Sequence, residues 1–110
     1  MADLNPLIHQ PTRLRIMAAL VSLSDGDKAD FSFLRDLLEL TDGNLSVHVQ
    51  RLEEAGYATV EKTYVGRRPK TWIWVTEGGR GAFAAHIDAL EAIVRQARTE
   101  IGRASCRERV

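Results

Sequence analysis

The sequence predicts an α+β fold that is mainly α, with three helices, a β-hairpin and a long final helix. Apolar residues recur at intervals of three and four through residues 11–23, 33–40, 42–55 and 77–98, which is the period of helices buried on one side. Over residues 57–75 the interval shortens to two, as in strands buried on one face. The change of period places a hairpin between the third helix and the last.

Length and composition indicate one ordinary globular domain. The chain has 110 residues, of which 45% are apolar and 27% charged, enough for a modest core. No apolar run approaches the roughly 20 residues of a membrane span, and the N-terminus lacks the regions of a signal peptide. The expected location is therefore the cytoplasm.

The last ten residues, "IGRASCRERV", are interpreted as a non-native, adapter-derived tail. They can be encoded by ATCGGAAGAGCGTCGTGTAGGGAAAGAGTG, which resembles a common sequencing-adapter sequence. We exclude 101–110 from the fold prediction and place a single domain at 1–100. The only cysteine, Cys106, lies in this tail, so the remainder offers no disulfide. Without the tail, Lys+Arg falls from 15 to 12 and Asp+Glu from 15 to 14, so the net charge moves from 0 to −2.

The segment before the third helix contains a lead-in, one helix and a short extended stretch. Residues 1–10 are expected to be non-helical because Pro6 and Pro11 discourage an earlier helix. Pro11 suits the first turn of the helix at 11–23. The acidic turn "SDGDKAD" ends that helix, and a short extended stretch is expected to begin at Phe31.

The second helix is short and has leucines on its inner side. Ser32 is the expected N-cap of the helix in "FLRDLLEL". Its period turns Leu34, Leu37 and Leu38 inward. A turn of three or four residues that contains glycine follows in "TDG".

The third helix has an apolar side and an unusually neutral polar side. Thr41 or Asp42 is expected to cap it, and Gly56 to end it after Ala55. Leu45, Val49 and Leu52 form its buried stripe. Amide, hydroxyl and imidazole groups fall on the other side, at Asn44, Ser46, His48 and Gln50, with Arg51 after them.

The hairpin is basic at its tip. "YATVEKTYV" and "TWIWV" are the expected strands, and "GRRPK" between them is the expected turn, with Arg67, Arg68 and Lys70 on it. In the second strand Ile73 and Val75 share one face, and Trp72 and Trp74 share the other. One of these pairs is expected in the core.

The final helix, expected over about 76–98 with Thr76 as its cap, has a heptad-like seam. Phe83, Ile87, Leu90 and Val94 alternate steps of four and three. This seam either packs on the first helix of the same chain or covers a second copy. We expect the dimer contact, with Leu7 and Ile8 contributing, because a single helix would leave the stripe exposed.

Three ordered motifs carry a resemblance to a known family. "NLSVHVQRLEEAGY", "GRRPKT" and "VTEGGR" follow one another at family spacing, and "HQPTRLRIMAAL" precedes them. Together they cover about residues 7–95. The chain resembles winged helix-turn-helix transcriptional regulators of the MarR/ArsR type, in particular small stand-alone members with a dimerising last helix.

The resemblance implies a homodimeric repressor that binds a palindromic double-stranded DNA operator. The third helix would enter the major groove, and the wing would contact the backbone or minor groove. The implied DNA-binding residues are Thr41, Asn44, Ser46, Val47, His48, Gln50, Arg51, Arg67, Arg68 and Lys70, and the implied dimer residues are Phe83, Ile87, Leu90 and Val94. A small-molecule effector is left open.

Other functions were weighed against this one. A winged helix that docks proteins without specific DNA binding is the main alternative, and the near-neutral charge suits it. An enzyme is not expected, because no nucleophile–base set or phosphate-binding glycine motif is found. No cofactor or metal is expected, since His9, His48 and His86 lack ligand spacing. The acids at 25, 27 and 30 do not match a calcium loop.

Overall fold

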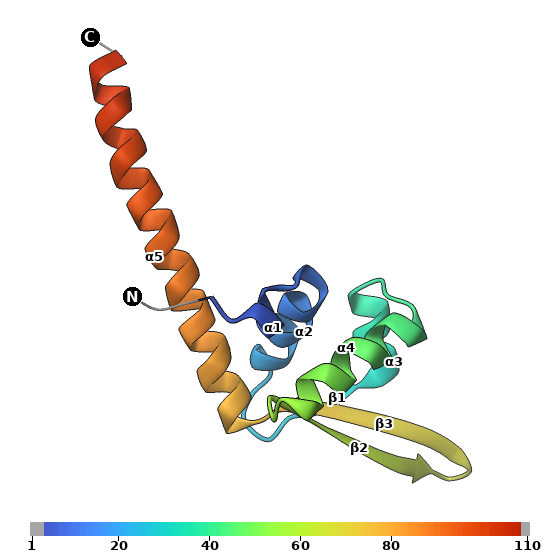
Figure 1. Ribbon diagram of the computed structural model, residues 1–110. Helices are drawn as coiled ribbons and strands as arrows, with labels where there is room; N and C mark the ends of the chain where they lie inside the picture. Colours follow the sequence, from blue (N-terminus) through green and yellow to red (C-terminus); the bar gives the residue numbers. More distant parts are fainter. Residues whose placement is uncertain (1–3, 109–110) are drawn as a thin grey trace.

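The computed structural model describes residues 4–108, with side chains described through Gly102, and has five helices and a three-stranded antiparallel sheet in that part of the chain. Figure 1 shows a body in which the shorter helices and the sheet lie together, and the last helix projects from it. The elements are α1 (Pro6–His9), α2 (Pro11–Val21), β1 (Ala29–Asp30), α3 (Phe31–Leu37), α4 (Asp42–Glu54), β2 (Ala58–Val65), β3 (Arg68–Val75) and α5 (Glu77–Glu108). The mainly helical α+β prediction is confirmed.

The predicted lead-in contains a helix that sequence reasoning missed. Pro6 occupies the first turn of α1, where its missing N–H costs nothing, and the Asn5 side chain accepts the N–H groups of Leu7 and Ile8. The expectation that Pro6 discourages helix here was therefore wrong. Ile8 is fully buried, so its expected contribution to a dimer contact is also wrong.

The hydrophobic core lies where α2, α4 and the sheet meet. Ile16, Met17 and Leu20 of α2 are buried there with the stripe of α4 and with Ile73 of β3. Leu45, Val49 and Leu52 are all buried, as their spacing predicts. This packing fixes which side of α4 remains free.

The extended stretch and the start of α3 lie one or two residues earlier in the chain than the sequence predicted. The extended pair is Ala29–Asp30, and helix already begins at Phe31. The cap is Asp30, whose carboxylate accepts the N–H of Ser32 at 3.3 Å, so Ser32 is not the cap. Leu37 is 56% exposed, because α3 is only two turns long and its inward side is filled by Leu34 and Leu38.

The connection between α3 and α4 has no glycine, contrary to expectation. Gly43 lies inside α4, and the left-handed residue of the connection is Glu39, with φ +55°. Thr41 caps α4, accepting the Asn44 N–H at 3.1 Å. Gly56 follows the helix with φ +80°, which confirms the predicted end.

The hairpin turn is tighter than predicted. Val65 pairs with Arg68, so only Gly66 and Arg67 form the turn, and β3 starts three residues earlier than expected. Gly66 has φ +66°, which suits the first position of a two-residue type II′ turn. Pro69 is tolerated within β3 because β1 pairs only with Ile73 and Trp72, leaving this part of β3 as an edge.

Strand β3 buries its aliphatic face, and this decides which of its two faces belongs to the core. Ile73 and Val75 are buried, and Trp72 and Trp74 are partly exposed. Lys70 lies 4.8 Å from the ring centre of Trp72, and Lys28 lies 4.4 Å from that of Trp74. Both tryptophans therefore cover the outer side of the sheet beneath lysine side chains.

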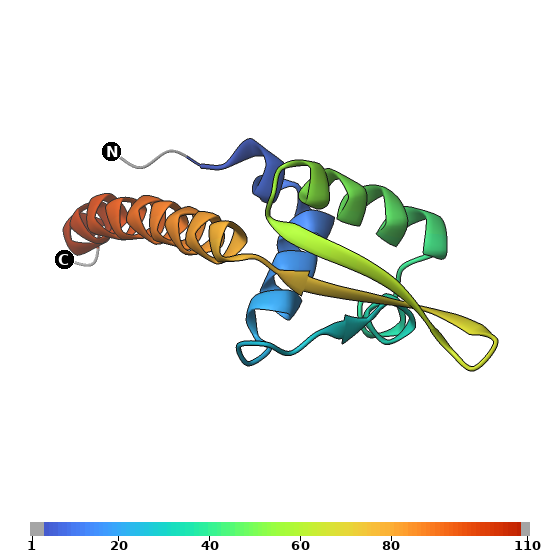
Figure 2. The same cartoon turned by 90° about the horizontal axis from the view of Figure 1, so that it is seen from below.

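Helix α5 begins as predicted at its cap Thr76, which accepts the Gly79 N–H at 2.9 Å. It has 32 residues and therefore spans about 48 Å. In Figures 1 and 2 it runs straight away from the body, and the molecule measures 70 × 26 × 23 Å. The segment that we interpret as an adapter-derived tail is helical through Glu108; its origin stays a prediction.

Candidate nucleic-acid interface

The side of α4 opposite its buried stripe is open to solvent. Of the residues predicted to contact DNA, six are exposed on or beside this helix: Thr41, Asn44, Ser46, Val47, Gln50 and Arg51. Val47 is 52% exposed, although it is aliphatic. The structure thus brings these predicted residues together on one surface of hydrogen-bonding groups with one apolar side chain.

His48 differs from the others because it is partly buried and touches another helix. Its Nδ1 lies 3.2 Å from Nη1 of Arg13 on α2. Burial lowers the pKa of the His48 ring, and the charges of Arg13 and Arg51 lower it further. His48 is therefore a neutral ring at the border between α4 and α2.

The start of α4 carries an ion pair that the sequence did not reveal. Nη1 of Arg35 on α3 donates to Asp42 Oδ1 at 2.7 Å, and its Nε donates to Asp36 Oδ1 at 3.0 Å. These hydrogen bonds raise the pKa of Arg35 above its ordinary value. The signal available in the sequence was the position of Arg35 between Leu34 and Asp36, which gives no hint of the contact with Asp42.

The three predicted cations of the hairpin have different surroundings. Arg67 and Arg68 are exposed, and neither forms an ion pair with any residue in 4–102, where side chains are described. Lys70 Nζ instead lies 3.7 Å from Asp30 Oδ2 and stacks on Trp72. The two arginines are therefore free to meet an anion, whereas Lys70 already faces one.

A groove of about 560 Å³ runs between the hairpin and the starts of α3 and α4. Its lining combines cationic and anionic groups with two hydroxyls, and its charged or polar members are Asp30, Ser32, Arg35, Asp42, Arg68, Lys70 and Thr71. A neighbouring hollow, lined in part by Ser46, Gln50 and Lys62, continues it along α4. The sequence motifs predicted α4 and the hairpin but missed α3 as the third wall.

The comparisons with known proteins agree on the family. A family model described as "Winged helix DNA-binding domain" matches residues 12–94. The chain belongs to the winged helix DNA-binding family. Its α4 is the recognition helix of this fold, and the β2–β3 hairpin is its wing. The resemblance stated from the sequence is thereby confirmed.

Individual relatives place this winged helix protein among transcriptional regulators. It is 37% identical over 81 residues to the uncharacterized protein MJ0432 of Methanocaldococcus jannaschii, covering 74% of this chain and 85% of that one. A transcriptional regulator homologue from Pyrococcus horikoshii is 31% identical, with a TM-score of 0.74 over 83% of this chain and 87% of that one. NMB1585, a MarR family regulator from Neisseria meningitidis, shares the fold, with 17% identity, a TM-score of 0.55, and coverage of 93% and 66%.

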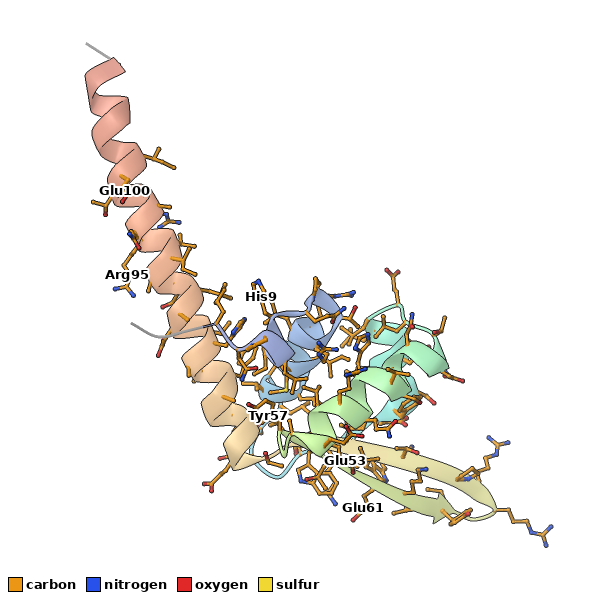
Figure 3. All side chains as sticks on the ribbon, viewed as in Figure 1. His9, Glu53, Tyr57, Glu61, Arg95 and Glu100 are labelled. Atoms are coloured by element: carbon orange, nitrogen blue, oxygen red, sulfur yellow. The ribbon has the colours of Figure 1, made fainter. Side chains whose placement is uncertain are left out.

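Helix α5 of the winged helix protein has two parts with different surroundings. Phe83 packs on the core of its own chain, and Ile87 and Leu90 are half-buried. Every residue from 91 to 100 is exposed, including Ile93 at 51% and Val94 at 46%. Figure 3 labels Arg95 and Glu100 on this projecting part. The N-terminal part of the predicted seam therefore packs within its own chain. The predicted seam did not include Ile93, whose side chain is exposed.

A polar cluster fastens α5 to α1. His86 of α5 is 1% exposed, and its Nδ1 accepts the Asn5 N–H at 3.0 Å. The Asn5 amide also donates to the Tyr57 hydroxyl at 2.9 Å, and the His9 ring lies 5.4 Å from that of His86. Burial, and then the nearby His9, lower the pKa of His86. The cluster holds together the start of α1, α5 and the segment that follows α4. From their sequence spacing His9 and His86 were considered only as metal ligands, and this cluster was not predicted.

Within the described residues, no helix is long and apolar enough to cross a membrane. In the same part of the chain, no group of three or more His, Cys, Asp or Glu side chains could hold a metal ion.

Proposed function

We propose that the protein binds operator DNA as a homodimer, with α4 in the major groove and the wing on the backbone or minor groove. The supporting observation is the open polar side of α4 beside two arginines that have no acidic partner among the side chains of residues 4–102. An α-helix fits the major groove, where amides such as Asn44 and Gln50 pair with adenine edges. Arg67 and Arg68 supply the phosphate contacts that provide most of the affinity.

The second copy is proposed from the free part of α5. Its aliphatic stripe continues for at least one turn beyond the last contact with the body, at Ile93 and Val94. Burying such a stripe against a second α5 removes apolar area from water. The Leu90, Ile93 and Val94 side chains would then hold two recognition helices at a fixed separation, which suits a palindromic site.

Occupation of an operator by such a dimer makes the protein a repressor when the site overlaps a promoter. The test is to select DNA from a random pool and measure its affinity at several salt concentrations. We expect a two-fold symmetric site and a log–log salt slope of about −0.9 for each phosphate contact. A protein that selects no sequence and binds no duplex at low salt would contradict the proposal.

Protein docking is the second candidate, favoured by one observation. Phe33 and Leu37 of α3 are 62% and 56% exposed and lie one turn apart. A docking partner would cover these side chains, whereas the proposed DNA contacts leave Phe33 free. Replacing both residues by serine should leave DNA binding intact; loss of a cellular phenotype with normal DNA binding would favour docking.

A further inference from the structure

The side chain of Arg13 joins α1, α2 and the recognition helix. Its Nε donates to the carbonyl oxygen of Leu7 in α1, and its Nη1 lies 3.2 Å from Nδ1 of His48 in α4. Both contacts are partly buried. The guanidinium plane is therefore held from two sides, and one edge faces the imidazole.

This contact fixes the proton on the imidazole. A guanidinium group has N–H donors only and no acceptor, and it stays charged. Nδ1 of His48 must therefore be the acceptor, without a proton, and the neutral ring carries its hydrogen on Nε2. His48 Nε2 has no hydrogen-bond partner within the described residues and is not among their buried unpaired atoms. It is consequently a donor open to solvent.

We propose that Arg13 is a positioning residue that holds His48 as a neutral Nε2–H donor toward an acceptor on DNA. This inference rests on the proposed function and adds a chemical preference to it. The acceptors of suitable chemistry are N7 or O6 of a purine, O4 of thymine, or a phosphate oxygen. His48 contributes one hydrogen bond and no charge, and Arg13 acts without touching the DNA.

Burial of His48 and the charges around it both favour the neutral ring. Arg13 from α2 and Arg51 from α4 both oppose protonation, and no carboxylate among the described side chains of residues 4–102 forms an ion pair with the ring. Lowering of the pKa from 6.5 keeps the ring neutral above about pH 6.5. Loss of Arg13 removes a neighbouring cation, so the pKa of His48 should rise.

The first experiment observes the ring nitrogens of the wild-type protein by ¹⁵N NMR. Between about pH 6.5 and 8, Nε2 should carry the proton and Nδ1 should be bare. A proton on Nδ1, or a charged ring in that range, would overturn the proposal. No variant is needed, so a folding defect does not interfere.

The second experiment uses Arg13→Met with DNA that the wild-type protein selects from a random pool. In this variant we expect binding to strengthen roughly threefold to tenfold from pH 8 to 6, because a protonated His48 adds one charge. Wild-type binding should change little. Arg15→Met is the matched control, since Arg15 lies on the same helix but donates to the Leu38 carbonyl oxygen. Arg13→Lys, which keeps a donor and a charge, should restore the wild-type profile.

Two further arms complete this test. Adding His48→Gln to Arg13→Met should abolish the new pH dependence; its persistence would overturn the assignment. With the wild-type protein, 7-deazapurine and methylphosphonate substitutions in the selected DNA distinguish a base-edge acceptor from a phosphate. If the wild-type protein binds tightly and His48→Ala costs nothing, the donor role fails while the proposed function stands. If the wild-type protein binds no DNA, the proposed function itself fails.

Discussion

At one end of the molecule, α4 and the wing expose amides, hydroxyls and guanidinium groups; at the other, the projecting part of α5 exposes isoleucine and valine. Both surfaces lack a partner in the single chain as described, yet they differ in chemistry. The polar end suits phosphate and base edges, which offer hydrogen bonds and charge. The aliphatic stripe suits another apolar surface, because only removal from water stabilises it. This difference in chemistry is the reason why we propose DNA as the partner of one end and a second copy as the partner of the other.

The largest expected effect comes from changing the aliphatic end. Ile93→Glu with Val94→Glu should turn the dimer into a monomer, because two carboxylates would have to be buried in the contact. Affinity for a palindromic site should fall about 100-fold through loss of avidity. Sedimentation and fluorescence anisotropy measure the two effects. Ala92→Glu, on the outer side of the same turn, is the control and should change neither.

The next effect concerns the wing. Arg67→Ala with Arg68→Ala should weaken binding to every DNA sequence by roughly tenfold, and the salt slope should become shallower by about 2 for each subunit. Titrations at several salt concentrations measure this. Arg95→Ala with Arg98→Ala removes the same charge from α5 and is the control. An unchanged slope in the wing variant would exclude phosphate contact by these arginines.

A smaller effect is expected from the recognition helix. Gln50→Ala should reduce discrimination between bases by about 1 kcal/mol, or about fivefold, while leaving non-specific affinity nearly unchanged. Binding to the selected site and to its single-base variants separates the two quantities. Gln96→Ala removes an amide from α5 as the control. Equal losses on all sequences would argue against base contact by Gln50.

The smallest effect is a gain. Asp42→Asn should release Arg35 from its 2.7 Å contact, and we expect roughly twofold to threefold tighter DNA binding with a salt slope steeper by about 1. The same titrations detect it. Asp88→Asn, which removes an equal charge from α5 far from the groove, is the control and should leave DNA binding unchanged. If both variants behave alike, Arg35 does not reach the DNA.

Much of the fold was predictable because its signals are local. The stripe of Leu45, Val49 and Leu52, a cap at Thr41 or its neighbour Asp42, and the end at Gly56 each follow from one helix and its period. The alternation of Ile73 and Val75 with the tryptophans likewise defined a strand with one buried face. Errors arose where neighbouring residues offered equivalent choices, as between Asp30 and Ser32 for the cap of α3.

The candidate site was predictable only in outline. The motifs located α4 and the basic hairpin, but Arg67, Arg68 and Lys70 looked equivalent in sequence. Pairing of Lys70 with Asp30 depends on β1 lying next to β3, which no local pattern reports. The Arg35–Asp42 contact likewise joins two helices.

The sequence by itself determined the order of the helices and strands that follow α1, the buried side of α4 and the basic turn, because each depends on residues close together in the chain. The tertiary structure decided which charges are free, that Ile8 is core, and that Arg13 meets His48 across 35 positions. Such contacts depend on how whole elements pack against each other. Packing also excludes water from between the elements, and the lower dielectric strengthens the contacts.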